Sequence, residues 1–287
     1  MMLFMLFILA LLFSFQSLFC RLYTSARNGE GAVQFSVFYA AFVGLCTLAI
    51  NRFAYVPSGI TVLLGLINAM ILLTYNIAMV RCGSLGSFAF MMVCSLSGGI
   101  LVPMVYDALY LGYVFSPIQL IAIALILVAF VLMNLDGIAA KKNMRYLLWC
   151  GILFLSNGLY GVIMNLQQTL MNFTLRNEMI ITTFLGMALM TSAFQLIVAR
   201  KDFLDGFNMS RRATLHLFLS ALSATLAVSL MMILMKSVNL TLLSVMDNGG
   251  VLVLSAVYAF TLFKEKPKPA GMLGLLLVGV GMLMLIL

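Results

Sequence analysis

Asp247 is the residue whose type and position most clearly point to chemistry. It lies about eight residues into an apolar run, roughly 12 Å along a helix that rises ~1.5 Å per residue. A carboxylate at that depth in a bilayer costs roughly 2.5–3.5 kcal/mol, so it needs a water-filled cavity, a partner or a proton. Asn248, Gly249 and Gly250 follow it, adding an amide and room for another backbone. We interpret Asp247 as a substrate ligand or a proton-exchanging carboxylate; the alternative is a structural hydrogen bond.

Neutral polar side chains in other apolar runs are further candidates for the same site. Such groups commonly hydrogen-bond across helices without any ligand. Gln16 and Asn157 gain weight because they occupy equivalent positions in the internal repeat described below, and Tyr75 and Tyr160 could wall a cation or a flat ring. The predicted substrate-binding residues are Asp247, Asn248, Gln16, Asn157, Tyr160, Asn68, Tyr75 and Ser97.

Motifs for catalysis, cofactors and metals are missing from the sequence. It contains no HExxH, GxSxG or P-loop pattern, and its five cysteines lack CxxC spacing, so we interpret them as free, packed thiols. Tyr106-Asp107 resembles half of an intramembrane aspartyl protease pair, but Asp247 lacks the flanking glycines that the second half requires. We expect no enzyme, no cofactor and no metal site, and keep the protease as a remote alternative.

The composition places these residues in a membrane. Hydrophobic residues make up 64% of the chain and charged residues 8%, against roughly 25% charged in soluble domains. Lipid-embedded backbone must satisfy its own hydrogen bonds, and the apolar runs are far too long for barrel strands, so we expect an all-α integral membrane protein. The net charge of +8 lies in short loops, which orient a membrane protein, so we expect no nucleic-acid partner.

Ten apolar runs are long enough to cross a bilayer core of ~30 Å. The first lacks a basic start and a small-residue cleavage site, so we interpret it as a retained helix. The predicted spans are 1–20, 32–50, 58–80, 84–107, 117–135, 146–168, 178–199, 212–235, 239–263 and 269–287.

An internal repeat relates the two halves of the chain. Four segments match in the same order: 13–19 with 154–160, 79–85 with 234–240, 98–102 with 249–253, and 111–117 with 263–269. Five spans per half is an odd number, so the second half must enter the membrane from the opposite side. We predict ten transmembrane helices as two inverted five-helix repeats, 1–140 and 141–287.

The loops predict an orientation. Of the 16 Lys and Arg residues, only Arg52, Arg176 and Lys236 fall on the side of the N-terminus. The other basic residues fall on the opposite side, which the positive-inside rule makes cytoplasmic, so both termini would face out.

The chain resembles the ten-helix branch of the drug/metabolite transporter superfamily, the EamA-type transporters. Glu265, Pro269 and the following glycines match the turn and glycine-rich helix that close a half in that family, whereas the first half has Leu111-Gly112-Tyr113 without the glutamate. The resemblance implies a transporter with a central cavity between the halves. Relatives are usually drawn with cytoplasmic termini, which conflicts with the charge distribution.

From these features we expect a secondary active transporter that moves a small polar or amphipathic metabolite (an amino acid, nucleobase or amine) by alternating access. A broad-specificity exporter of lipophilic cations is the alternative. The expected partners are the small-molecule substrate, the lipid bilayer and a coupled proton or ion, with the protein acting as a monomer or a homodimer. The expected location is the bacterial inner (plasma) membrane.

Overall fold

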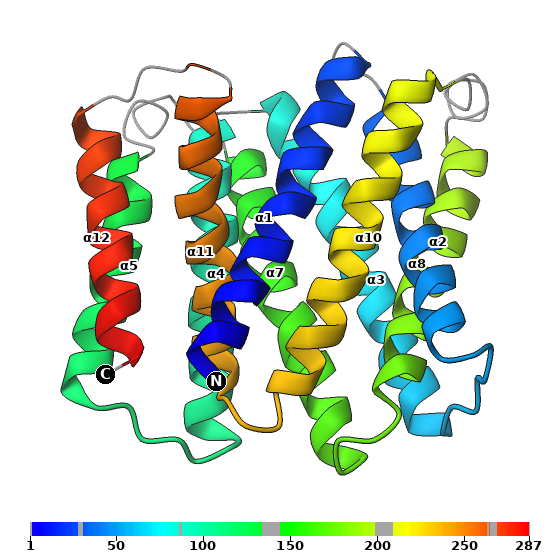
Figure 1. Ribbon diagram of the computed structural model, residues 1–287, viewed down its shortest axis with the longest axis horizontal. Helices are drawn as coiled ribbons and strands as arrows, with labels where there is room; N and C mark the ends of the chain where they lie inside the picture. Colours follow the sequence, from blue (N-terminus) through cyan, green and yellow to red (C-terminus); the bar gives the residue numbers. More distant parts are fainter. Residues whose placement is uncertain are drawn as a thin grey trace. The chain divides into compact units, whose positions relative to one another are not determined.

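The computed structural model describes residues 2–27, 31–85, 88–133, 144–198, 209–262, 264 and 269–286, and within these ranges the chain forms helices without strands (Figure 1). Some residues used in the sequence analysis lie outside the described residues. They are Glu265, on which the family resemblance partly depends, and the basic residues Lys141, Lys142, Arg200, Lys201, Lys266 and Lys268. The helices are α1 (Met2–Ala26), α2 (Ala32–Ile50), α3 (Gly59–Leu85), α4 (Phe88–Leu109), α5 (Pro117–Met133), α7 (Met144–Leu170), α8 (Arg176–Val198), α10 (Arg211–Leu234), α11 (Leu240–Thr261) and α12 (Pro269–Ile286).

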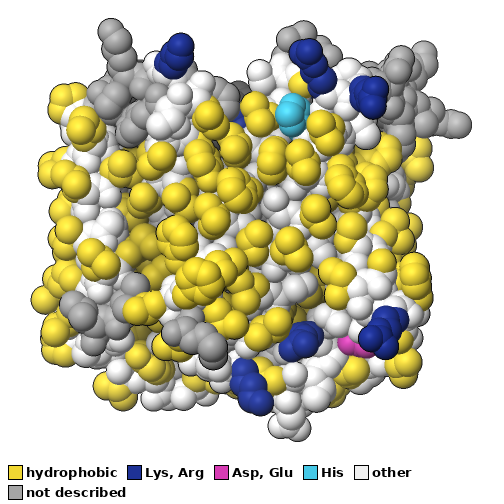
Figure 2. Space-filling model, in the orientation of Figure 1, with side chains coloured by type: hydrophobic (Ala, Val, Ile, Leu, Met, Phe, Trp, Pro, Cys, Tyr) yellow, Lys and Arg dark blue, Asp and Glu magenta, His cyan; other side chains and the backbone are white. Residues whose placement is uncertain are grey.

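Eight of these helices are long and apolar enough to cross a membrane, while α5 and α12 are equally apolar but shorter. Their outward side chains are large and hydrophobic, as lipid-facing positions require; Leu276 and Leu283 of α12 are both 67% exposed. Figure 2 shows Lys and Arg side chains near the two ends of the helices and hydrophobic side chains along the length between them. These features confirm the expected class, an α-helical integral membrane protein.

The helix boundaries follow local sequence signals. Pro117 and Pro269 each begin a helix, where the missing N–H costs nothing and the fixed φ suits the first turn. Ser210 and Asn239 cap α10 and α11, their side chains accepting hydrogen bonds from the backbone N–H three residues on, at 3.3 and 2.8 Å. One C-terminal boundary differs from the prediction: α3 continues to Leu85, whereas the predicted span ends at residue 80.

The helices form two compact units, each built from both halves of the sequence. Unit 1 comprises residues 1–10, 74–162 and 237–287; unit 2 comprises residues 11–73 and 163–236. Three helices, α1, α3 and α7, contribute a segment to each unit. The two units do not coincide with the predicted repeats 1–140 and 141–287, because each unit contains segments of both. The repeats concern equivalent positions in the sequence, and they remain a prediction.

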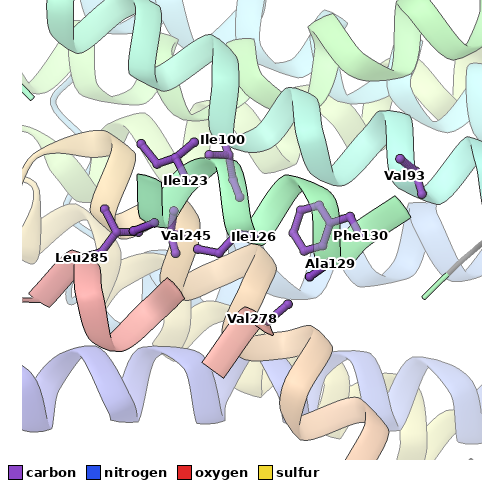
Figure 3. Packing of buried hydrophobic residues seen from close by; sticks show 10 residues of the cluster. Val93, Ile100, Ile123, Ile126, Ala129, Phe130, Val245, Val278 and Leu285 are labelled. Carbon is purple, nitrogen blue, oxygen red and sulfur yellow. The ribbon is translucent and has the colours of Figure 1, made fainter. Parts of the chain in front are cut away.

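In unit 1, α5 packs along α12, and α4 packs on α11. A buried cluster joins these four helices, with Ile126 and Phe130 of α5 meeting Val278 of α12, Ile100 of α4 and Val245 of α11 (Figure 3). The cluster fixes α11, which carries Asp247, to its neighbours in the same unit.

In unit 2, α2 packs on α8 and α10. Polar contacts join the ends of the first two helices: the Asn51 amide donates to Glu178 at 3.2 Å and accepts from the Asn177 amide at 2.9 Å. Tyr55 bonds Thr182 of α8 at 2.9 Å. These bonds hold one end of unit 2 where the chain leaves the apolar region.

The seam between α5 and α12 predicts opposite effects for two glycines of α12. A methyl group added at Gly281 would lie 2.6 Å from Ile126 Cγ1 and 2.9 Å from the Ala122 carbonyl oxygen, so Gly281→Ala must push α5 away. We expect a loss of about 1–3 kcal/mol in the free energy of unfolding, measured as a lower melting midpoint in detergent.

Gly279→Ala is the matched control, because no heavy atom of the described residues lies within 4 Å of its added methyl group. It should leave the midpoint unchanged or raise it slightly, since alanine favours helix. Equal midpoints for the two variants would contradict the packing of α5 on α12.

Candidate functional site

Two asparagines and a serine from three helices meet in unit 1. The Asn157 amide of α7 donates to the Ser95 carbonyl oxygen of α4 at 2.8 Å and to Asn248 Oδ1 of α11 at 3.3 Å. The Asn248 amide donates in turn to the Ser244 carbonyl oxygen, one turn earlier in α11, at 2.9 Å. The network orients two predicted site residues, Asn157 and Asn248, and places them within hydrogen-bonding reach of each other.

This network depends on a close approach of α4 and α7. A Cβ at Gly98 would collide with the Phe154 carbonyl oxygen, and a Cβ at Gly158 would lie 2.5 Å from the Gly98 carbonyl oxygen, so both positions need glycine. At Gly99, a Cβ would lie 2.6 Å from Asn157 Nδ2 and 2.7 Å from Asn248 Nδ2. The missing side chain at Gly99 therefore makes the space that the two amides occupy.

Two tyrosines face the same region of unit 1. The hydroxyl of Tyr75, on α3, lies 3.3 Å from Ser95 Oγ, which joins it to the network through α4. Asp247 of α11 lies within electrostatic range of both Tyr75 and Tyr160 of α7. Five predicted site residues, Asp247, Asn248, Asn157, Tyr75 and Tyr160, thus gather in unit 1.

Asp247 itself is half-buried, one residue before Asn248 on α11. Its carboxylate forms no hydrogen bond or ion pair with any of the described residues, in contrast to its amide neighbours. A membrane-embedded carboxylate without protein partners must find water, a proton or a ligand. The site therefore presents an available negative charge or acid group, flanked by phenols and by amides held in place.

Three other predicted residues, Ser97, Gln16 and Asn68, take no part in these contacts within the described residues. Ser97 is half-buried on α4 but stands two residues from Ser95, and positions two apart do not share a helix face. Gln16 belongs to unit 2, where its amide donates to the Tyr39 hydroxyl at 2.8 Å and its backbone carbonyl accepts from Ser220 Oγ at 3.0 Å.

Asn68 also belongs to unit 2, on α3. It is fully buried, and neither of its amide atoms has a hydrogen-bond partner in the part of the chain that the structure describes. A buried amide in that state loses ~1–3 kcal/mol per unsatisfied group, so Asn68 stays a candidate for binding water or a polar ligand.

Sequence reasoning missed two members of the site, Ser95 and Gly99. Ser95 was visible as a buried polar residue in an apolar run, but nothing in the sequence ranked it above Ser97. Gly99 belongs to the glycine pair Gly98-Gly99 that the repeat matches with Gly249-Gly250, so the repeat was the signal that could have found it.

Asp107 has a structural role at the end of α4. It is fully buried, and the backbone N–H and hydroxyl of Thr241 both donate to its Oδ2, at 2.7 and 2.6 Å. The carboxylate thereby satisfies an unpaired N–H and the positive dipole at the start of α11. Asp247 stands six residues beyond Thr241, roughly 9 Å along the helix, so this geometry gives no support to a catalytic aspartate pair.

Comparisons with known proteins support the fold alone. No protein-family model matches the sequence, and no curated protein matches it significantly. Twenty-nine chains of solved structures are similar. One of them, a crystal structure described only as that of a protein, has a TM-score of 0.78 and 15% sequence identity, covering 98% of this chain and 94% of the other. At that identity the similarity concerns architecture and carries no activity.

Removal of the Asp107 carboxylate should destabilise the protein. Asp107→Ala leaves the Thr241 N–H and hydroxyl buried without their acceptor, so we expect a loss of about 1–3 kcal/mol in unfolding free energy, read from the melting midpoint in detergent. Asp107→Asn keeps an acceptor oxygen and should lose less. A midpoint unchanged in Asp107→Ala would contradict the capping role.

Proposed function

We propose that this protein is a secondary active transporter of a small polar or amphipathic metabolite, which it moves by alternating access. The observation that carries the proposal is the Asp247 carboxylate: half-buried in a membrane-crossing helix, without a hydrogen bond to the described residues, and within electrostatic range of two phenols. Ionisable groups inside membrane segments are costly and mark ion or substrate pathways.

The residues around Asp247 favour substrates that carry an amino group. A carboxylate pairs with an ammonium group, the faces of Tyr75 and Tyr160 attract cations, and Asn248 Oδ1 adds an acceptor. Amino acids, amines and nucleobases with exocyclic amino groups fit this pattern. The same carboxylate can instead bind and release a proton, which would couple transport to the proton gradient.

The predicted inverted repeat is part of the proposal, and packing within each unit supports it. Helices in equivalent positions of the two halves pack on one another: α5 on α12, α4 on α11 and α2 on α8. The glycine pairs are used alike, since Gly99 of α4 approaches α7 while its counterpart Gly250 of α11 approaches Ala10 of α1. Helices α1 and α7 are themselves equivalent in the repeat.

Membership of the EamA-type transporters and residence in the bacterial inner membrane belong to the same proposal. The assignment to this family is based on Pro269 and the glycines that follow it. The bacterial inner membrane is proposed because of the assignment to this family. The proposed working unit is a monomer or a homodimer.

A broad exporter of lipophilic cations is the second candidate. A carboxylate within electrostatic range of two phenols suits a flat, hydrophobic cation as well as a small amine. The 23 methionines of the chain supply adaptable apolar surface for such ligands. The number and polarity of the ligands that bind distinguish the two candidates.

Loss of the Asp247 charge should weaken recognition of the substrate amine. A thermal-shift screen of the purified protein against amino acids, nucleobases, quaternary amines and sugars identifies the ligand. For a ligand found in this way, Asp247→Asn should weaken binding by roughly 10- to 100-fold, the effect of losing a hydrogen bond to a charged group.

Glu178→Gln is the matched control, because it removes one carboxylate at a helix end while keeping an acceptor for Asn51. It should bind the ligand as the wild type does. Unchanged affinity, uptake and pH dependence in Asp247→Asn would refute the role of Asp247. One strongly stabilising polar metabolite would favour the first candidate, and weak stabilisation by many lipophilic cations the second.

A further inference from the structure

A cleft at one end of unit 1 carries two arginines and the only tryptophan of the chain. It has a volume of about 270 Å³ and is lined by Ile77, Arg81 and Leu85 of α3 and by Arg145 and Trp149 of α7. All five residues belong to unit 1. The proposed transport site lies elsewhere, at Asp247 on α11.

Helical spacing explains why these side chains line one cleft. Ile77, Arg81 and Leu85 follow one another at intervals of four residues, and so do Arg145 and Trp149, so each set forms a stripe on one helix face. Packing beneath the stripes holds the helices together, because the thiols of Cys82 and Cys150 are buried 3.8 Å apart.

The residues of the cleft form two levels along the helices α3 and α7. Arg81 is near the end of α3 and Arg145 is the second residue of α7, and both are exposed. Ile77 and Trp149 stand one turn farther inside, roughly 6 Å along their helices. Charge at the headgroup level above an apolar level with tryptophan is the pattern of a membrane interface.

We propose that this cleft binds the headgroup of an anionic phospholipid. Two guanidinium groups offer paired donors to phosphate oxygens. The cation of a zwitterionic headgroup would be repelled by the two guanidinium groups, whereas an anionic headgroup brings no such repulsion. Basic pockets between membrane helices bind anionic headgroups in this way.

The size of the cleft fits a headgroup with its chains left in the bilayer. Its volume is below the ~300–1,000 Å³ of pockets that enclose a drug-sized ligand. Ile77 and Trp149 then contact the first carbons of the acyl chains. A lipid seated across α3 and α7 would join two helices that contribute to both units, independently of any transported substrate.

Trp149 makes the proposal directly measurable, because bromine on a lipid chain quenches the fluorescence of a tryptophan that it touches. The protein is reconstituted in phosphatidylcholine vesicles that contain increasing fractions of brominated phosphatidylglycerol, and a parallel series uses brominated phosphatidylcholine. We expect phosphatidylglycerol to bind at Trp149 about tenfold more strongly than phosphatidylcholine, as two basic contacts allow.

Three double variants separate a site from a general surface charge. Arg81→Gln with Arg145→Gln should abolish the preference, each single change should reduce it, and Arg81→Lys with Arg145→Lys should retain part of it. Arg211→Gln with Arg212→Gln also removes two positive charges, and the predicted spans put these residues on the same membrane side as Arg81 and Arg145. This variant should keep the full preference for phosphatidylglycerol.

Three results would overturn the proposal. The first is equal quenching of the wild type by both brominated lipids. The second is an equal loss of preference in the two glutamine double variants, which would mean a diffuse charge effect. The third is relief of quenching by millimolar inorganic phosphate, which would mean a site for free anions.

Discussion

The contact between the backbones of α4 and α7 at Gly98 and Gly158 is the constraint on which the candidate site depends. Any side chain at either glycine would meet the backbone of the other helix, so the approach is possible only with glycine at both. The approach brings Asn157 within 2.8 Å of the Ser95 carbonyl oxygen, and the amide then reaches Asn248 on α11. Three helices are thereby joined by polar contacts in an otherwise apolar setting.

Asp107 and Asp247 have different roles because their surroundings differ. Asp107 is fully buried, but Thr241 and the start of α11 satisfy one of its oxygens, so its charge supports the fold. Asp247 is more accessible and lacks such donors among the described residues. In the same helix bundle, one carboxylate is used for stability, and the other remains available for chemistry.

The sequence predicted the helices better than the faces they present. Prolines at 117 and 269 begin helices as expected, and long apolar runs define the class of protein. Runs that are apolar on all sides carry no signal of helix rotation, so Ser95 and Ser97 could not be ranked. Within the described residues, it is Ser95 that contacts Tyr75 and Asn157. The two compact units depend on contacts between distant segments, which hydropathy does not encode.

The most direct test of the account is an experimental structure with a bound ligand from the stabilisation screen. The account predicts a basic nitrogen of the ligand within about 3 Å of an Asp247 carboxylate oxygen, with Tyr75 or Tyr160 against the ligand. A ligand bound elsewhere, with Asp247 hydrogen-bonded to the protein, would contradict it.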